Sequence, residues 1–350
     1  MVFTKAGQRR PAKGERMSPH HLVNCISSGI PSMDTQLLGG GIPVGYVLSI
    51  VQDDPSVYWK LFAKFFCAEG LEADQNILLI GRGANTMARE LPESTDSQEK
   101  ANVSGNAQNE EKLKIAWAYQ KKRQPMGRAG ISHIPGTNRF GHLYDVSTYR
   151  KFENISNCVT IIDPEDSSSK EDFHDRINQS LKRLKDDSSG AWRVCFLDFG
   201  GMCYPMASKL AKLLLDVRLL SASKSLANNT FLLTTQRCVA ETVCRFSDAQ
   251  YELENFLVKE SQFKSQFDGT IEVNKMVQVG LKPFQQSVAT FGFKLKRKKF
   301  TIEPLHLPPD FDEGKTRDGE DNSYQSACSS IPSNPSGDSS GCCGGGSCDF

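Results

Sequence analysis

The sequence lacks several features that would assign it to a class at once. It has no CxxC pair among its 11 cysteines, no apolar run long enough to span a membrane, and almost no charge imbalance, with a net charge of +1. The missing CxxC pairs and the absence of a secretory signal favour a reducing compartment, so we expect a cytoplasmic and nuclear protein. The balanced charge excludes a general attraction for polyanions and restricts nucleic-acid binding to local patches.

Residue combinations that mark common enzyme classes are absent as well. The chain contains no GxSxG nucleophile turn and no HExxH zinc motif, and its 6 histidines are scattered. Cys342, Cys343 and Cys348 lie in a low-complexity segment rich in Gly and Ser, with no fourth metal ligand nearby. We therefore predict no catalytic residue and no metal site.

What the sequence does contain is a regular alternation of two kinds of segment. Apolar runs rich in β-branched residues are separated by stretches with helical periodicity, one of which opens with a capping box at Ser169. The alternation predicts an α/β fold with a mainly parallel sheet flanked by helices. The predicted strands span residues 46–51, 76–80, 159–162, 194–197 and 230–235, and the predicted helices span 56–69, ended by Gly70, and stretches that follow Ser169 and Pro205.

Other patterns mark the boundaries of this domain. Three β-like segments, at residues 270–273, 288–295 and 300–302, have no helix between them and predict an antiparallel C-terminal edge of the sheet. We expect one domain over residues 24–309, with a mobile polar insertion at about 84–135. A disordered basic arm over 1–23 fits a localisation or RNA-binding role and equally a solvated tail, and residues 310–350 form a disordered tail rich in Ser, Gly and Cys.

The turn after the first strand of a parallel sheet is where a phosphate-binding loop belongs. A working loop, GxxxxGK[ST], wraps phosphates in backbone N–H groups, neutralises charge with its Lys and holds Mg²⁺ through its hydroxyl. Here the segment over residues 52–60 has no glycine, two aspartates that repel polyphosphate, a proline without an N–H donor, and a lysine past the expected position. This degenerate loop consists of Asp53, Asp54, Pro55, Ser56 and Lys60.

An ATPase also needs an acidic residue at the end of an apolar strand, where it holds Mg²⁺ through water. Asp198, after residues 194–197, has this Walker B-like form, and Asp163, after 159–162, fits almost as well. Many parallel strands end in aspartate at this edge, so an acidic residue without a phosphate loop is weak evidence for an ATPase. The chain is therefore predicted not to be an enzyme, with an active ATPase of non-standard site as the alternative.

Two segments are candidates for RNA binding. Lys294, Lys296 and Lys298 alternate with apolar residues, which indicates a strand with one packed and one cationic face. The same pattern is typical of an edge strand guarded by lysines against aggregation, and the spacing does not choose between the two. Arg237, Arg245 and Phe246 follow the fifth strand and combine charge with a ring for stacking on a base, although ordinary loop residues have this composition too.

Several of these segments together resemble a known family. Residues 28–34 and 37–45, the degenerate loop, residues 67–70 and the long block 293–309 resemble the fourth subunits of the Elongator complex, as does the ending Asp349-Phe350. The likeness covers roughly residues 25–310, with gaps at the insertion. The block 293–309 is its most specific part, because the opening glycine motif is shared more widely among RecA-like proteins.

The resemblance implies a RecA-like fold without standard nucleotide-binding motifs. It further implies a hetero-hexameric ring with the fifth and sixth subunits, which docks on the catalytic acetyltransferase subcomplex, binds tRNA and supports modification of wobble uridines. No cofactor is then required, and the interfaces between ring subunits are where the resemblance leaves room for ATP. A third interpretation, a RecA-like DNA-repair protein, fits poorly because strand-exchange relatives depend on ATP.

Overall fold

The computed structural model describes most of the predicted domain. The described residues are 13–18, 20, 22–53, 55, 57–95, 140–167, 169–186, 191–205, 207–222, 229–257, 261, 263–279, 282–283, 290–296 and 299–305. The predicted tail at 310–350 and most of the arm lie outside them, as do Asp54, Ser56 and Lys298.

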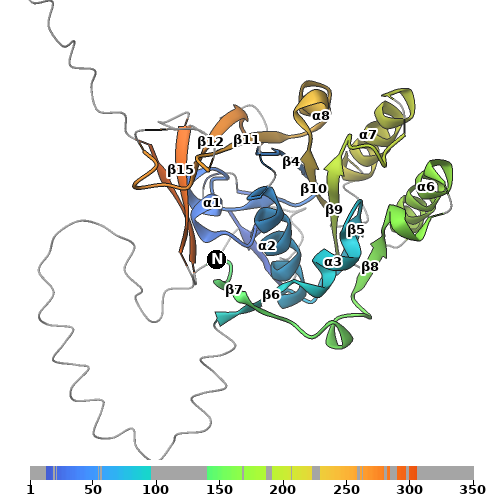
Figure 1. Cartoon of the computed structure of the whole chain (residues 1–350), viewed down its shortest axis with the longest axis horizontal. Coiled ribbons are helices and arrows are strands. Elements are labelled where there is room, and N and C mark those ends of the chain that lie inside the picture. The colour runs from blue at the N-terminus through green and yellow to red at the C-terminus, as the bar shows by residue number, and fades with distance from the viewer. Residues whose placement is uncertain are drawn as a thin grey trace, which may run out of the picture. The chain divides into compact units, whose positions relative to one another are not determined.

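A nine-stranded sheet in the order β16-β15-β12-β11-β4-β10-β9-β5-β8 is the centre of the fold (Figure 1). Six strands are parallel: β4 (Val47–Val51), β5 (Asn76–Ile80), β8 (Val159–Ile162), β9 (Trp192–Phe199), β10 (Thr230–Thr235) and β11 (Ala249–Asn255). The antiparallel edge consists of β12 (Gly269–Lys275), β15 (Thr290–Lys296) and β16 (Lys299–Pro304). The predicted α/β fold, with a mainly parallel sheet, flanking helices and an antiparallel C-terminal edge, is confirmed.

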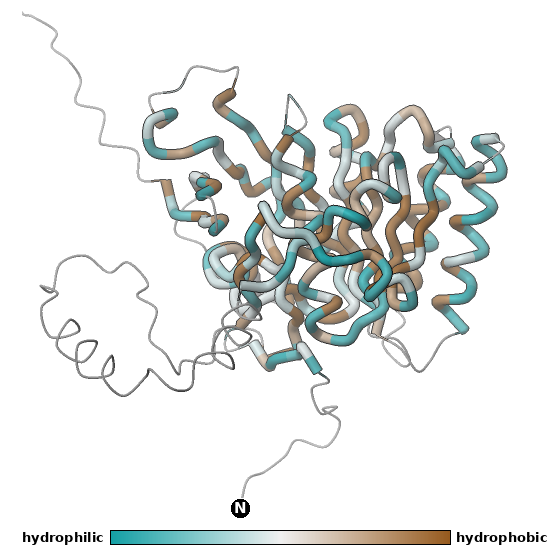
Figure 2. Tube along the Cα trace, turned by 60° about the horizontal axis from the view of Figure 1, so that its bottom comes forward, coloured by the Kyte–Doolittle hydropathy of each residue, from teal (hydrophilic) through white to brown (hydrophobic). Residues whose placement is uncertain are grey.

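Alternating side chains of the parallel strands build two separate apolar cores. On β10, Leu232 belongs to the first core, which includes residues of α1 (Pro31–Gln36), α2 (Trp59–Glu72) and α3 (Ala84–Arg89). Its neighbours Phe231 and Leu233 belong to the second core, which includes residues of α6 (Lys170–Asp186), α7 (Ala207–Ala222) and α8 (Ala240–Phe246). Strands covered on both faces are apolar along their whole length. The apolar colour is accordingly concentrated in the strands at the centre of the tube in Figure 2. None of the helices in the described ranges is long and apolar enough to cross a membrane.

The sequence missed the sixth parallel strand, β11. Its residues alternate between apolar and polar types, with Tyr251 and Leu253 buried in the first core and Glu252 and Glu254 half-buried. β11 pairs with β4 in parallel and with β12 antiparallel, so it joins the parallel part of the sheet to the antiparallel edge.

Two predicted boundaries were wrong, namely the end of the disordered arm at residue 23 and the start of the insertion at residue 84. Glu15–Met17, inside the predicted disordered arm, forms β1 and pairs with β2 (Asn24–Ile26), which also pairs with β3 (Ile42–Pro43). The start of the predicted insertion at residue 84 is also ordered: it forms α3 and then β6 (Pro92–Ser94), which pairs with β7 (Tyr144–Tyr149). Residues 96–139 lie outside the described ranges. The remaining short elements are β13 (Gln278–Val279), β14 (Lys282–Pro283), η2 (Phe152–Asn154), η3 (Pro164–Asp166) and η4 (Arg237–Val239).

The prediction that Gly70 ends α2 was wrong, because the helix continues to Glu72. A Cβ atom at Gly70 would lie 2.5 Å from Ile77 Cδ1 and 2.7 Å from Arg193 Cδ. Glycine is therefore required here by packing, since the side chain of a buried arginine passes directly over the helix.

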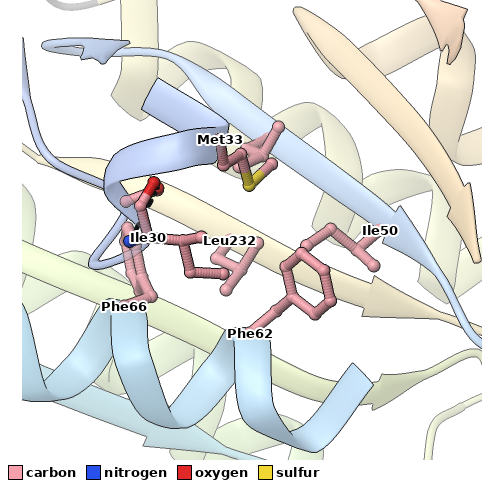
Figure 3. A pocket seen from close by; sticks show the side chains of 8 residues that line it. Ile30, Met33, Ile50, Phe62, Phe66 and Leu232 are labelled. Atoms are coloured by element: carbon pink, nitrogen blue, oxygen red, sulfur yellow. Dashed lines mark hydrogen bonds between the residues drawn. The ribbon is translucent and has the colours of Figure 1, made fainter. Parts of the chain in front are cut away.

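Packing between α1, α2 and the sheet leaves one small gap. Figure 3 shows Ile30 and Met33 facing Phe62 and Phe66 of α2, with Ile50 of β4 and Leu232 of β10 beside them. The gap has room for about one water molecule and is almost wholly apolar, so it is a packing defect rather than a ligand site.

Arg193 of β9 is 1% exposed and holds the first core together through polar contacts. Its Nε donates to Gln75 Oε1 at 2.6 Å, and its Nη1 donates to the carbonyl oxygens of Ser27 at 2.7 Å and Phe66 at 3.0 Å. The guanidinium also lies over the Phe66 ring, 4.9 Å from its centroid. One side chain thus ties the segment before α1, helix α2 and the loop before β5 to the sheet.

Replacing this side chain is expected to destabilise the domain strongly. Arg193→Met keeps most of the volume but removes the hydrogen bonds that the guanidinium donates to three buried acceptors, so the free energy of unfolding should fall by about 3 kcal/mol. Urea denaturation measures the loss. Arg183→Met, on the exposed side of α6, is the matched control and should change stability by less than about 0.5 kcal/mol. Equal losses for the two variants would contradict this role.

Candidate functional site

The carboxyl ends of the parallel strands bring a group of polar side chains to one edge of the sheet. Asp53 follows β4, Asp198 lies near the end of β9, Gln236 follows β10, and Asn255 ends β11. Gln52, also after β4, completes the group, which we call the carboxyl-edge cluster. Open α/β sheets bind their ligands at this edge, and the degenerate loop lies here.

Asp53 is 2% exposed, and its carboxylate points at the start of α2. Its Oδ2 accepts hydrogen bonds from the backbone N–H groups of Val57 and Tyr58, and its Oδ1 accepts one from Trp59, each at 3.1 Å. Trp59 is the first residue of α2, and Val57 and Tyr58 directly precede it, so none of these N–H groups has a partner within the helix. The predicted repulsive residue is therefore an internal anion bound to the helix terminus.

Asn255, which the sequence did not single out, holds this carboxylate from the other side. Its Nδ2 donates to Asp53 Oδ2 at 2.7 Å and to the carbonyl oxygen of Pro55 at 2.9 Å. Its Oδ1 accepts a hydrogen bond from Leu257 N at 3.2 Å. One amide from β11 thus binds both the carboxylate and the backbone of the loop. The sequence signal for this role is that Asn255 is a polar residue at the end of the alternating segment 249–255.

Asp198 has the Walker B-like position that was predicted, but its carboxylate already has partners. Its Oδ1 accepts from Gln236 Nε2 at 2.9 Å and from Gln52 Nε2 at 3.2 Å. Its backbone is in the left-handed region, with φ of 52°, and its N–H donates to Thr234 Oγ1 at 3.0 Å. Two glutamine amides therefore fix the carboxylate in place, one after the neighbouring strand β10 and one after β4, the next strand beyond it.

The other candidates for nucleotide chemistry lie apart from this cluster. Asp163 accepts hydrogen bonds from Asn85 N and Glu165 N, both at 3.1 Å, so it caps α3 and the short helix η3. Lys60 is exposed on α2, and its Nζ lies 5.8 Å from the centroid of the Trp59 ring. Among the described residues, neither Asp163 nor Lys60 forms a hydrogen bond or an ion pair with Asp53 or Asp198. No three His, Cys, Asp or Glu residues within the described ranges are grouped to hold a metal.

The predicted RNA residues after β10 are largely engaged with the protein itself. Arg237 forms an ion pair with Glu252 at 3.3 Å, and Arg245 forms one with Glu241 at 2.7 Å, one helical turn away. The Phe246 ring packs against the second core and is half-buried. This segment therefore offers little unpaired charge and no free ring.

Two of the three lysines of the predicted cationic face, Lys294 and Lys296, lie on β15, which forms a hairpin with β16, and Lys298 lies outside the described residues. Lys296 pairs directly with Lys299 in the antiparallel register, and Lys294 pairs with Thr301. Directly paired residues share a face, so Lys294, Lys296 and Lys299 lie together, while Phe293 and Phe300 stack on the opposite face, 5.7 Å between centroids. In the part of the chain that the structure describes, no carboxylate lies within ion-pairing distance of these lysines.

Comparisons with known proteins agree over most of the chain. A family model described as PAXNEB protein matches residues 8–339. The chain is 28% identical over 362 residues to Elongator complex protein 4 of Homo sapiens, covering 90% of this chain and 84% of that protein. For the protein of the same name in Danio rerio the identity is 28% over 352 residues, covering 87% and 86%, and in Drosophila melanogaster it is 24% over 422 residues, covering 90% and 95%.

Among solved structures, the KaiC-like protein PH0186 from Pyrococcus horikoshii OT3 is similar with a TM-score of 0.43 at 15% identity. The match covers 81% of this chain and 100% of that one.

Asn255→Asp is expected to break the carboxyl-edge cluster. The change places a second carboxylate where an amide donor now lies 2.7 Å from Asp53, which removes a hydrogen bond to a charged group and adds repulsion between like charges. The free energy of unfolding at pH 7.5, measured with urea, should fall by about 2–3 kcal/mol. Asn274→Asp is the matched control, because Asn274 donates to Glu252 at 3.1 Å on the exposed side of β12. A loss no larger than in the control would show that the buried contact contributes little.

Proposed function

This chain belongs to the PAXNEB family, and from that premise we propose that it is a subunit of the Elongator complex. The relatives named Elongator complex protein 4, which match over most of their own length, support this proposal. In it, the chain is a non-catalytic RecA-like subunit that forms a hetero-hexameric ring with the fifth and sixth subunits. The ring docks on the catalytic acetyltransferase subcomplex, binds tRNA and supports wobble-uridine modification in the cytoplasm and the nucleus.

The observation that carries the non-catalytic role is the position of the Asp53 carboxylate. A nucleotide phosphate would need the N–H groups at the start of α2, and Asp53 already accepts hydrogen bonds from three of them. The alternative, an active ATPase with a non-standard site, would require Lys60 or Asp198 to act on the nucleotide. Asp198 is instead bound by two glutamine amides, and Lys60 lies over the Trp59 ring.

We further propose that the carboxyl edge packs against a neighbouring ring subunit. Val57 and Leu257 donate their N–H groups to Asp53 and Asn255, and their side chains are 44% and 53% exposed. Two exposed aliphatic side chains beside a buried polar cluster suit the core of a protein–protein contact. Any ATP at such an interface would be held largely by residues of the neighbouring subunit.

For tRNA, we favour the hairpin lysines over the segment after β10. Lys294, Lys296 and Lys299 share one face, whereas Arg237 and Arg245 are each paired with a glutamate. Cations without an acidic partner contact phosphates at lower cost, because no existing ion pair must be broken. Phosphate contacts of this kind give affinity without sequence preference.

Assembly is the first test of the proposal. Coexpressed with the fifth and sixth Elongator subunits of the same species, the full chain should co-purify with both at equal stoichiometry, and the assembly should retain tRNA at physiological salt. Lys60→Ala and Asp198→Asn, made separately, should leave any ATP turnover of the assembly unchanged. A chain that joins neither partner refutes the assembly role, and a turnover lost in both variants would favour the active ATPase.

The hairpin lysines are tested by their effect on tRNA affinity. Lys294, Lys296 and Lys299 changed together to Gln should weaken tRNA binding by the assembly about tenfold at 150 mM salt and flatten the plot of log K against log[salt] by roughly 2 units. Arg237→Gln with Arg245→Gln is the control and should change the affinity less than threefold. Filter binding at several salt concentrations measures both. The reverse ranking would place the contact after β10.

A further inference from the structure

The position of Asp53 differs from that of an ordinary helix cap. Helix α2 begins at Trp59, and its N-cap residue, Tyr58, makes no side-chain cap hydrogen bond. A capping side chain belongs to the N-cap residue itself and binds the N–H two or three positions later. Asp53 instead reaches across the loop from the end of β4, six residues before Trp59, so its carboxylate approaches the helix terminus from outside, as a bound anion does.

The contacts of this carboxylate are those that a phosphate group makes in a phosphate-binding loop. Such a loop supplies several backbone N–H donors from the start of the helix and one cationic or polar side chain. Here three N–H groups and the Asn255 amide converge on the two carboxylate oxygens. The Asn255 amide also binds the Pro55 carbonyl, which draws the loop over the carboxylate and buries it.

The second half of an ATP site is filled in a matching way. An acidic residue in the position of Asp198 holds a metal through water, which donates its hydrogens to the carboxylate. In this chain, the amide groups of Gln52 and Gln236 donate to Asp198 Oδ1 at 3.2 and 2.9 Å. They follow the adjacent strands β4 and β10, which lie on one side of β9 in the sheet. Gln52 is the direct chain neighbour of Asp53, so both substitutions lie on the same loop.

The residues therefore do not fit a nucleotide, and we infer that they replace one: the Asp53 carboxylate is a built-in substitute for a nucleotide phosphate, and the Gln52 and Gln236 amides are substitutes for metal-bound water. The carboxyl edge then keeps the closed geometry of a filled site without a ligand. This inference deepens the proposed non-catalytic role, on which its meaning in an assembly rests, but it is tested on the isolated full-length chain.

Chemical rescue tests whether the carboxylate acts as a bound anion. Asp53→Ala removes a group of the size of formate and leaves the N–H donors and Asn255 in place. The variant should unfold about 5 °C below the wild type, and 100 mM sodium formate should restore at least half of that loss, while sodium chloride of equal ionic strength restores none. Formate and chloride should shift the wild type equally. Formate without effect on the folded variant overturns the inference.

Two further variants separate a vacant anion position from a general loss of stability. Asp53→Asn keeps the volume but places a donor against N–H groups, and Asn255→Ala removes the clamp but leaves the carboxylate. Both should unfold at lower temperature than the wild type, and formate should rescue neither, because Asp53→Asn leaves no vacancy and the vacancy in Asn255→Ala lies beside the Asp53 carboxylate, which repels an anion. Rescue of either one to the same degree as Asp53→Ala would show a non-specific effect of formate and overturn the inference.

A local fluorescence measurement does not depend on whether Asp53→Ala folds. Trp59 donates its backbone N–H to Asp53, and replacing the other two of the 3 tryptophans, Trp117 and Trp192, by Phe makes it the only indole fluorophore. Sodium tripolyphosphate should leave the Trp59 emission of this otherwise wild-type chain unchanged up to 10 mM. A saturable change would mean that a phosphate displaces Asp53 and would overturn the inference. Failure to assemble with Elongator subunits would refute the proposed function and leave these results intact.

Discussion

This edge of the protein depends on one buried carboxylate, which is held by hydrogen bonds from peptide N–H groups and a side-chain amide rather than by an ion pair. Asp53 is compatible with burial because its charge is spread over four hydrogen bonds, three of them from the positive end of a helix. Those bonds join the start of α2 to the ends of β4 and β11, two strands that are also paired with each other in the sheet. The geometry of the loop, the start of α2 and the end of β11 all follow from this one group.

On our proposal of a non-catalytic subunit, the same edge explains how a RecA-like fold can have a structural role. The scaffold of strand, loop and helix is kept, and the N–H groups at the start of the helix still require an acceptor. Loss of a nucleotide would leave them unsatisfied unless the chain itself supplied an anion. The aspartates and glutamines of the carboxyl edge therefore compensate for a lost ligand, on our proposal, and are not remnants of a degenerate nucleotide site.

Most of the architecture could be predicted from sequence, because buried parallel strands are continuous apolar runs. The segments 76–80, 159–162 and 230–235 coincide with β5, β8 and β10. β11 was missed because its alternating charged residues lie on a strand that is only partly buried. Gly70 was misread for a different reason: the residue that demands it, Arg193, is 123 positions away in the chain, and local patterns carry no information about such a contact.

The candidate site was predicted less well than the fold. Asp53 and Asp198 were found because a loop and a strand end have fixed positions in a parallel sheet, but they were interpreted as groups that repel or await a ligand. Their partners, Gln52, Gln236 and Asn255, are neutral residues that no motif marks. Hydrogen bonds between residues about 200 positions apart, such as that of Asn255 with Asp53, become visible only once the topology places the strand ends side by side.

The covalent attachment of the Asp53 carboxylate has a consequence for timing. A diffusible nucleotide binds and dissociates according to its concentration and is consumed by hydrolysis, but a side chain that is covalently part of the chain has no dissociated pool. If the carboxylate replaces a nucleotide, this subunit cannot sense the adenylate energy charge of the cell. In a ring whose other subunits respond to nucleotide, this subunit would then keep one conformation while the others change theirs.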